Sequence, residues 1–275
     1  MTAIAVPPAP AQVVDLVDER TPLSHVVGDA LAVARRNLIG LMRVPTTVVF
    51  STIQPVIFVL MFRYVFGGAF KAIPGVRYVD FLMAGIFVQT VTFGSTNTGI
   101  GLAMDMQTGL MERFRSLPMA RSAVLAGRTL ADLVRNLFVV VLMVVVGFAV
   151  GFRVHTGVVP FLGAVGVILL FGLAMSWVMA LVGLATGNAE AAQAASFPLM
   201  AVLVFASSAF APTSSMPGPL RAYANHQPVT AAVDAVRVLV IGGPTTHKVL
   251  VAVAWMVGIT VVFATLAVNR YRRAA

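Results

Sequence analysis

Cysteine is absent from this 275-residue chain, and charged residues are scarce. The lack of cysteine excludes disulfide bonds, thiolate catalysis and cysteine-based metal sites. Charged residues make up 11% of the chain, whereas hydrophobic residues make up 59% and the mean hydropathy is +0.94. A soluble domain has about 25% charged residues. The composition therefore predicts an integral membrane protein whose main solvent is the lipid bilayer.

Lysine is also rare, and its two occurrences carry no nucleotide-binding motif. Neither Lys71 nor Lys248 follows the glycine-rich sequence that holds phosphate groups in a phosphate-binding loop. The four histidines are scattered without the spacing of metal ligands. We therefore expect no catalytic residue, no metal site and no cofactor bound by this chain.

The charge that is present is mainly positive, with 19 lysines and arginines against 10 acidic residues. In a soluble protein this balance would indicate nucleic acid. Membrane proteins instead collect arginine in their cytoplasmic loops, so we expect no nucleic-acid partner. Arginines cluster before residue 46, between 113 and 128, and after 269. These three segments lie on one side of a chain that crosses the membrane six times, and the charge rule makes that side the cytoplasm.

Six apolar stretches have the roughly 20 residues that a helix needs to cross a bilayer. They predict an all-α membrane domain at 46–268 with six transmembrane helices and both termini in the cytoplasm. The expected spans are about 46–66, 80–102, 131–152, 158–186, 191–211 and 248–268.

The segments outside the spans complete this predicted organisation. Residues 24–45 have apolar positions at helical spacing with a polar opposite face, which predicts an amphipathic helix at the membrane interface. The alternative is a helix packed on a soluble partner. The other segments are a flexible cytoplasmic tail at 1–23, a cytoplasmic loop at 103–130, a re-entrant extracytoplasmic segment with short helices at 212–247, and a cytoplasmic C-terminus at 269–275.

The second span is unusually polar. Gln89, Thr92 and Thr96 recur at helical spacing, and Asn97 lies beside them. These residues are candidates for the wall of a polar pathway. The alternative is hydrogen bonding between helices, worth about 0.6 kcal/mol per contact in membranes.

Ionisable residues are expected near span ends rather than deep in the bilayer. Asp132 and Arg135, for example, come at the start of the third expected span. An ion-coupled transporter keeps such residues near the bilayer centre. Their predicted placement therefore weakens secondary transport as a function.

A charged segment at 109–121 separates the second and third spans. It reads Gly109-Leu-Met-Glu112-Arg113-Phe-Arg115-Ser-Leu117-Pro118-Met-Ala-Arg121. In a helix, Glu112 and Arg115 would lie on neighbouring turns. The helix would end at Leu117-Pro118, because a residue that precedes proline avoids helical geometry. Membrane insertion does not require this order, so the pattern predicts a docking surface for a cytoplasmic partner. The alternative is a topology anchor, for which only the net positive charge matters.

This charged segment resembles the first cytoplasmic loop of type-2 ATP-binding cassette (ABC) exporter permeases, in particular the drug-resistance branch named for daunorubicin. The shared pattern falls on Gly109, Glu112, Arg113, Arg115, Leu117, Pro118 and Arg121. Two further stretches resemble that branch, at 207–217 and at 226–244. The likeness covers nearly the whole membrane part of the chain.

The resemblance implies a permease subunit that exports a hydrophobic or amphiphilic drug, antibiotic or lipid. It implies a homodimer or heterodimer of permeases with two copies of a cytoplasmic ABC ATPase, and ATP and Mg²⁺ bound on that partner. The charged segment, within a coupling loop at 103–130, and the N-terminal helix with Arg35 and Arg36 would contact the ATPase. The implied location is the bacterial inner (plasma) membrane. An ion-coupled secondary transporter and a non-transporting membrane scaffold remain the alternatives.

Overall fold

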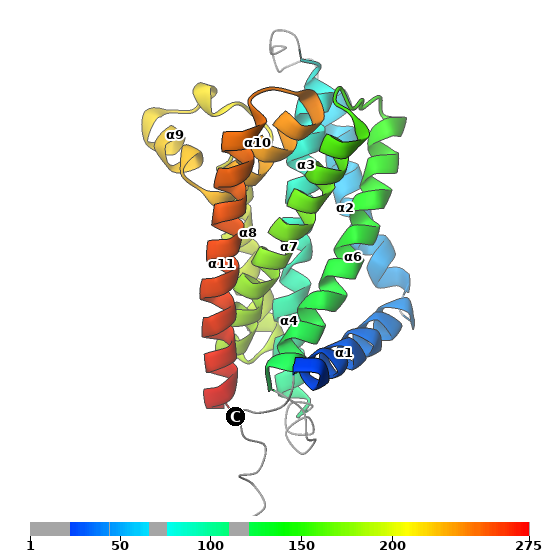
Figure 1. Cartoon of the computed structure of the whole chain (residues 1–275), viewed down its shortest axis with the longest axis vertical. Helices are drawn as coiled ribbons and strands as arrows, with labels where there is room; N and C mark the ends of the chain where they lie inside the picture. The colour runs from blue at the N-terminus through cyan, green and yellow to red at the C-terminus, as the bar shows by residue number, and fades with distance from the viewer. Residues whose placement is uncertain (1–22, 44, 66–75, 110–120, 275) are drawn as a thin grey trace, which may run out of the picture.

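The computed structural model describes residues 23–43, 45–65, 76–109 and 121–274, and within these residues all regular structure is helical. Long helices run side by side along the molecule, while the first helix lies across its lower end (Figure 1). The longer helices are α1 (Leu23–Arg43), α2 (Pro45–Leu60), α3 (Tyr78–Gly94), α4 (Thr96–Gln107), α6 (Arg121–Ala149), α7 (Val158–Thr186), α8 (Ala189–Phe205), α10 (Pro228–Ile241) and α11 (Thr245–Ala274). The short elements are a π-helical turn at Met61–Val65, a 3₁₀ turn at Thr213–Ser215 and α9 (Gly218–Asn225).

Four of the described helices are long and apolar enough to cross a membrane. They are Tyr78–Gln107, which joins α3 and α4, and then Leu125–Ala149, Val158–Thr186 and Thr245–Tyr271. Two shorter apolar helices, Ile53–Val65 and Ala189–Phe205, coincide with the first and fifth expected spans. The all-helical membrane fold is therefore confirmed, whereas the count of six spans and the cytoplasmic termini stay predictions.

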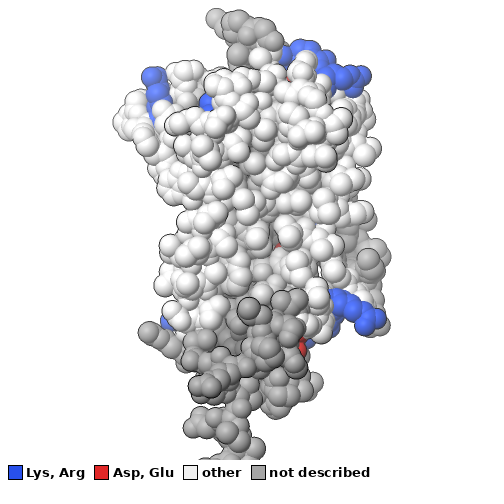
Figure 2. Space-filling view, viewed as in Figure 1, with Lys and Arg blue, Asp and Glu red and all other residues white. Residues whose placement is uncertain are grey.

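The distribution of surface charge agrees with a membrane domain. Figure 2 shows Lys and Arg at the two ends of the molecule, and between them a broad band of this face that is almost entirely uncharged. Large apolar side chains along the long helices are exposed, among them Phe138 on α6 and Val261 on α11. Exposing such side chains to water costs free energy, whereas contact with lipid tails does not.

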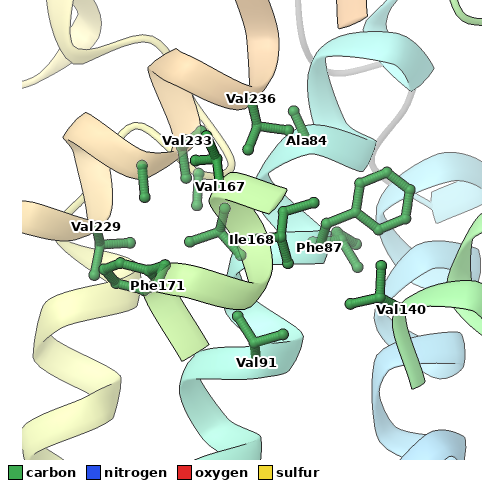
Figure 3. Close-up of a cluster of buried hydrophobic side chains, with 14 of the residues drawn as sticks. Ala84, Phe87, Val91, Val140, Val167, Ile168, Phe171, Val229, Val233 and Val236 are labelled. Atoms are coloured by element: carbon green, nitrogen blue, oxygen red, sulfur yellow. The ribbon is translucent and has the colours of Figure 1, made fainter. Parts of the chain in front are cut away.

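Much of the core lies where α10 packs against α3 and α7, and where α6 packs against the same two helices. Val229 of α10 lies beside Phe171 of α7, and Val236 of α10 lies near Ala84 of α3, while Phe87 of α3 lies on the side of Val140 of α6 (Figure 3). The segment at 212–247, expected to be re-entrant with short helices, contains α9 and α10, and its place outside the membrane stays a prediction. The structure adds that α10 is almost entirely buried, because its β-branched residues fill the space at one end of the bundle.

Glycines set how closely the helices approach. A side chain at Gly183 of α7 would overlap the backbone of Gly99 on α4, and one at Gly127 of α6 would overlap the carbonyl of Ala30 on α1. Small residues allow such backbone contacts between membrane helices. The result is two closely packed pairs, α4 with α7 and α1 with α6.

The turn between α7 and α8 is encoded locally. Gly187 ends α7 with a φ of +62°, a left-handed conformation that glycine adopts without strain. The Asn188 side chain then accepts hydrogen bonds from the backbone N–H groups of Glu190 and Ala191, which caps the start of α8. The two helices can therefore reverse direction within two residues.

The helix α6 begins at Arg121 rather than near residue 131, where the third span was expected to start. Arg135 consequently lies at the midpoint of α6, and Asp132 lies one turn before it. Both charges were expected at the start of a span at about 131–152, whereas the apolar helix Leu125–Ala149 places them well inside its first half. The early start was hidden because the first turns of α6 are polar and read as part of the loop.

Candidate functional site

A cavity of about 660 Å³ lies between α2, α3, α4, α6 and α8. Although it is enclosed by apolar helices, much of its wall is polar. The polar lining residues include Gln54, Gln89, Thr96, Asn97, Arg135, Asn136 and Gln193. Gln54, Asn97 and Gln193 are exposed, so the cavity opens to the surface of the chain. Its polarity within the uncharged band makes it the best candidate for a transport pathway.

Three of the four predicted pathway residues reach this cavity. Gln89, Thr96 and Asn97 line it, whereas Thr92 is fully buried and donates its hydroxyl to the Val88 carbonyl. Thr96, the first residue of α4, likewise donates its hydroxyl to a nearby carbonyl, that of Phe93 near the end of α3. The alternative interpretation of this polar span was hydrogen bonding between helices. Thr98, which is not one of the four predicted pathway residues, makes such a bond, because its hydroxyl donates to Asp132 of α6.

An ion pair supports the wall that α6 contributes. Arg135 Nη2 lies 3.2 Å from a carboxylate oxygen of Asp132 and donates a hydrogen bond of 2.6 Å to the Gly94 carbonyl. Both side chains are almost fully buried. A charge in this position is expensive in hydrocarbon unless it is paired and hydrogen-bonded. The cavity therefore contains a guanidinium whose charge is balanced, beside neutral amides and hydroxyls.

The cavity wall also holds polar atoms without a hydrogen-bond partner. Among the described residues, Gln89 Oε1 and Asn136 Nδ2 are buried and unpaired. Asn136 Nδ2 lies against Gly172 of α7, where a side chain would come within 2.9 Å of it. Buried polar groups are nearly always satisfied. The unpaired oxygen of Gln89 is thus available to a ligand or to water in the cavity.

Aromatic rings flank the polar residues. Phe93 of α3 and Phe197 of α8 both line the cavity, with ring centroids 6.1 Å apart. Further along α2 and α8, Phe58, Phe62 and Phe205 pack with Phe210. Rings and amides in one cavity can contact the apolar body and the polar edge of an amphiphilic molecule.

Of the predicted coupling residues, the structure describes Arg35, Arg36, Gly109 and Arg121. They belong to α1, to the end of α4 and to the start of α6, which lie at one end of the molecule (Figure 1). Gly109 follows α4 with a φ of +67°, and Arg121 begins α6. Arg35 and Arg36 are exposed on α1, while Ala30, Val33 and Ala34 are buried. Glu112, Arg113, Arg115, Leu117 and Pro118 lie outside the described residues.

The stretches at 207–217 and 226–244 meet in one hydrogen-bonded unit at the opposite end. Arg237 of α10 donates to the carbonyls of Ser208 and Ala209 and lies 3.4 Å from the ring centre of Phe81. Asp234 accepts from the Ser208 hydroxyl. Burial lowers the pKa of the Arg237 guanidinium to about 9, and the Asp234 carboxylate opposes that shift. These residues hold the end of α8 against α3 and α10.

The contribution of α6 to the site was not predicted from the sequence. Arg135 and Asn136 line the cavity from a helix whose polar residues had been assigned to a loop or a span end. A usable signal was present, because Arg128, Asp132 and Arg135 recur at the spacing of one helix face. The contributions of Gln54 and Gln193 were also not predicted, and each is the one amide side chain of its helix.

Comparison with known proteins identifies the family. Residues 29–241 match the sequence profile described as ABC-2 type transporter, which covers well over half of the chain. The chain belongs to the ABC-2 type transporter family. This result confirms the family that the charged segment at 109–121 and the stretches at 207–217 and 226–244 resemble.

Individual relatives of this permease point to the same branch. The "Daunorubicin resistance ABC transporter permease protein DrrB1" of Streptomyces coeruleorubidus is 32% identical over 92% of this chain and 89% of its own length. The "Probable doxorubicin resistance ABC transporter permease protein DrrC" of Mycobacterium tuberculosis is 28% identical over 96% of this chain and 98% of its own length. The chain is accordingly a multi-pass membrane permease subunit of an ABC exporter, a family that works as permease dimers with an ABC ATPase.

Proposed function

We propose that this permease moves an amphiphilic, drug-like molecule out of a bacterial cell across the inner membrane. Two permease chains, identical or different, would work with two copies of a separate cytoplasmic ATPase. ATP and Mg²⁺ would bind to that ATPase, and this chain would bind neither. The relatives named for daunorubicin and doxorubicin resistance support this substrate class.

The observation that carries the proposal is the chemistry of the cavity. It combines amide side chains, a charge-balanced Arg135 and the Phe93–Phe197 pair inside an otherwise apolar bundle. A small ion would need a closer set of ligands, and a purely apolar lipid tail would leave the amides unsatisfied. An amphiphile with flat rings and a hydrogen-bonding edge matches both kinds of wall.

The coupling site proposed for the ATPase comprises the charged segment at 109–121, with Glu112 and Arg115, and the exposed Arg35 and Arg36 of α1. The position of α1 beside the start of α6 supports a shared docking surface, because both elements lie at one end of the molecule. That end would face the cytoplasm.

The test is export of daunorubicin by cells that express the permease with its cognate ATPase. Asn97→Leu removes an amide from the cavity mouth, so a ligand would lose one hydrogen bond, worth about 0.5–1.5 kcal/mol. We expect drug export at sub-saturating concentration to fall by a corresponding factor, with assembly unchanged. The matched control is Asn225→Leu, at an exposed position at the end of α9.

Two outcomes would contradict the proposal. If the assembled wild-type complex leaves the accumulation of daunorubicin and of a wider amphiphile panel unchanged, this substrate class is wrong. If the complex exports drug but Asn97→Leu and Asn225→Leu behave alike, the cavity is not where the drug binds.

A further inference from the structure

Charged residues of α6 form a stripe that faces α4. Arg128, Asp132 and Arg135 follow one another at intervals of four and three residues, which places them on one face of the helix. Each has a partner across the gap. Arg128 pairs with Asp105, Asp132 accepts from the Thr98 hydroxyl, and Arg135 donates to the Gly94 carbonyl.

These contacts form a ladder with two defined ends. Moving forward along α6, the partners move backward along α4 and into α3, as expected for antiparallel helices. The ladder starts at Asp105 and Arg128, close to where α4 and α6 flank residues 110–120. It finishes at Arg135 and Gly94, which both line the cavity. The ladder therefore joins the predicted coupling segment to the proposed drug site.

The ladder differs in kind from the other contacts of these helices. The close backbone contact of α4 is with α7, at Gly99 and Gly183, and that of α6 is with α1, at Gly127. Between α4 and α6, by contrast, the interactions of the ladder are made by side chains. Such contacts can be removed singly without disturbing the backbone packing on either side.

The first contact of the ladder, between Asp105 and Arg128, is partly buried and closely packed. Asp105 and Arg128 are each about four-fifths buried, so their attraction is screened less than that of a surface pair. The Arg128 guanidinium lies directly over Gly101, where a side chain would overlap it. A side chain at Gly101 would therefore force the Arg128 guanidinium to move from its present position beside Asp105.

We propose that the Asp105–Arg128 pair is a positioning contact that makes α4 and α6 move as one unit, so that displacement of the segment between them reaches the cavity. This inference rests on the proposed function. Without this first contact, α4 and α6 could separate at their ends, and the motion imposed by the ATPase would be absorbed there. The pair would then govern coupling rather than drug binding or ATP hydrolysis.

The first experiment removes this contact in two independent ways, with Asp105→Asn and with Gly101→Ala. Both variants should assemble with the ATPase and keep its basal ATP hydrolysis. Drug-stimulated hydrolysis and export should fall by about tenfold, within the usual range of coupling between distant sites. The matched controls are Glu190→Gln, which neutralises an exposed acid, and Gly166→Ala, whose added carbon meets nothing within 4 Å.

The second experiment restores the link covalently. The chain has no cysteine, so Asp105→Cys combined with Arg128→Cys provides the only two thiols. Before treatment this variant should be as uncoupled as Asp105→Asn. A short bifunctional thiol reagent should then recover drug-stimulated hydrolysis and export, because α4 and α6 are again joined.

Several results would overturn the proposal. They are normal coupling in Asp105→Asn, no recovery after cross-linking, and a failure of both single variants to assemble, which would assign the pair to folding. Failure of the proposed function looks different, since the wild-type complex itself would then export no drug in the same assay.

Discussion

At the scale of single residues, the packing at the end of the molecule opposite α1 depends on one glycine. Gly85 of α3 faces the backbone of Ala209, in the connection after α8, and an added side chain would overlap the Ala209 carbonyl oxygen. Arg237 holds the same connection through the carbonyls of Ser208 and Ala209. The backbone at Ala209 therefore cannot move away without breaking these hydrogen bonds.

We therefore predict that Gly85→Ala destabilises the permease by about 1–3 kcal/mol or more, the cost of overpacking a fitted core. The measurement is the thermal unfolding midpoint in detergent, together with the yield of folded protein. Gly166→Ala, on the exposed side of α7, should leave the midpoint unchanged. Equal midpoints for the two variants would show that the approach of α3 to Ala209 is not as close as described.

At the scale of elements, α1 separates a packing face from a charged face. Ala30, Val33 and Ala34 are buried, and the close approach at Gly127 shows that they pack on α6. Arg35 and Arg36 are exposed. The helix can thus offer two cations to a partner without changing its contact with the bundle.

The double variant Arg35→Gln and Arg36→Gln should therefore bind the ATPase at least about tenfold more weakly, equivalent to roughly 1.4 kcal/mol of lost contact. Its unfolding midpoint should stay that of the wild type. Binding is measured by co-purification or by surface-immobilised permease in detergent. Arg270→Gln, an exposed arginine near the same end on α11, is the control, and an equal loss there would indicate an unspecific effect of charge.

At the scale of the whole molecule, the two ends differ in what they expose. One end carries α1, the end of α4, the start of α6 and the C-terminal end of α11, whereas α9 and α10 lie at the other (Figure 1). The arginine distribution predicts that the first of these ends faces the cytoplasm. Ser214, in the 3₁₀ turn after α8, is exposed at the opposite end.

The orientation can be tested because the chain contains no cysteine. Ser214→Cys should react with a membrane-impermeant thiol reagent added to intact cells, since we place this residue outside. Ser116→Cys, in the charged segment, should react only after the cells are opened. The reversed labelling pattern would invert the topology and remove the basis for an ATPase contact at 109–121.

Composition and local residue order were enough to predict the fold class and the family, and they also singled out polar residues of α3 and α4 as candidates for a pathway. A sufficiently long apolar stretch indicates a membrane helix whatever surrounds it. The residues of the charged segment at 109–121 are consecutive, so their pattern can be recognised without knowing the fold. The polar run from Gln89 to Asn97 also identified three lining residues before any neighbour was known.

Contacts between helices that are distant in the sequence became visible only in the folded bundle. The structure showed that α6 brings Asp132 and Arg135 to the middle of the bundle, because the helix starts in a polar stretch that hydropathy assigns to a loop. The structure also shows that α10 is buried in the core, although the polar segments on either side of it led us to expect it outside the membrane. It paired Asp105 with Arg128 over Gly101. A partner across a helix interface leaves no mark in the local sequence, since the energy of such a contact depends on the distance and register between segments and not on either segment alone.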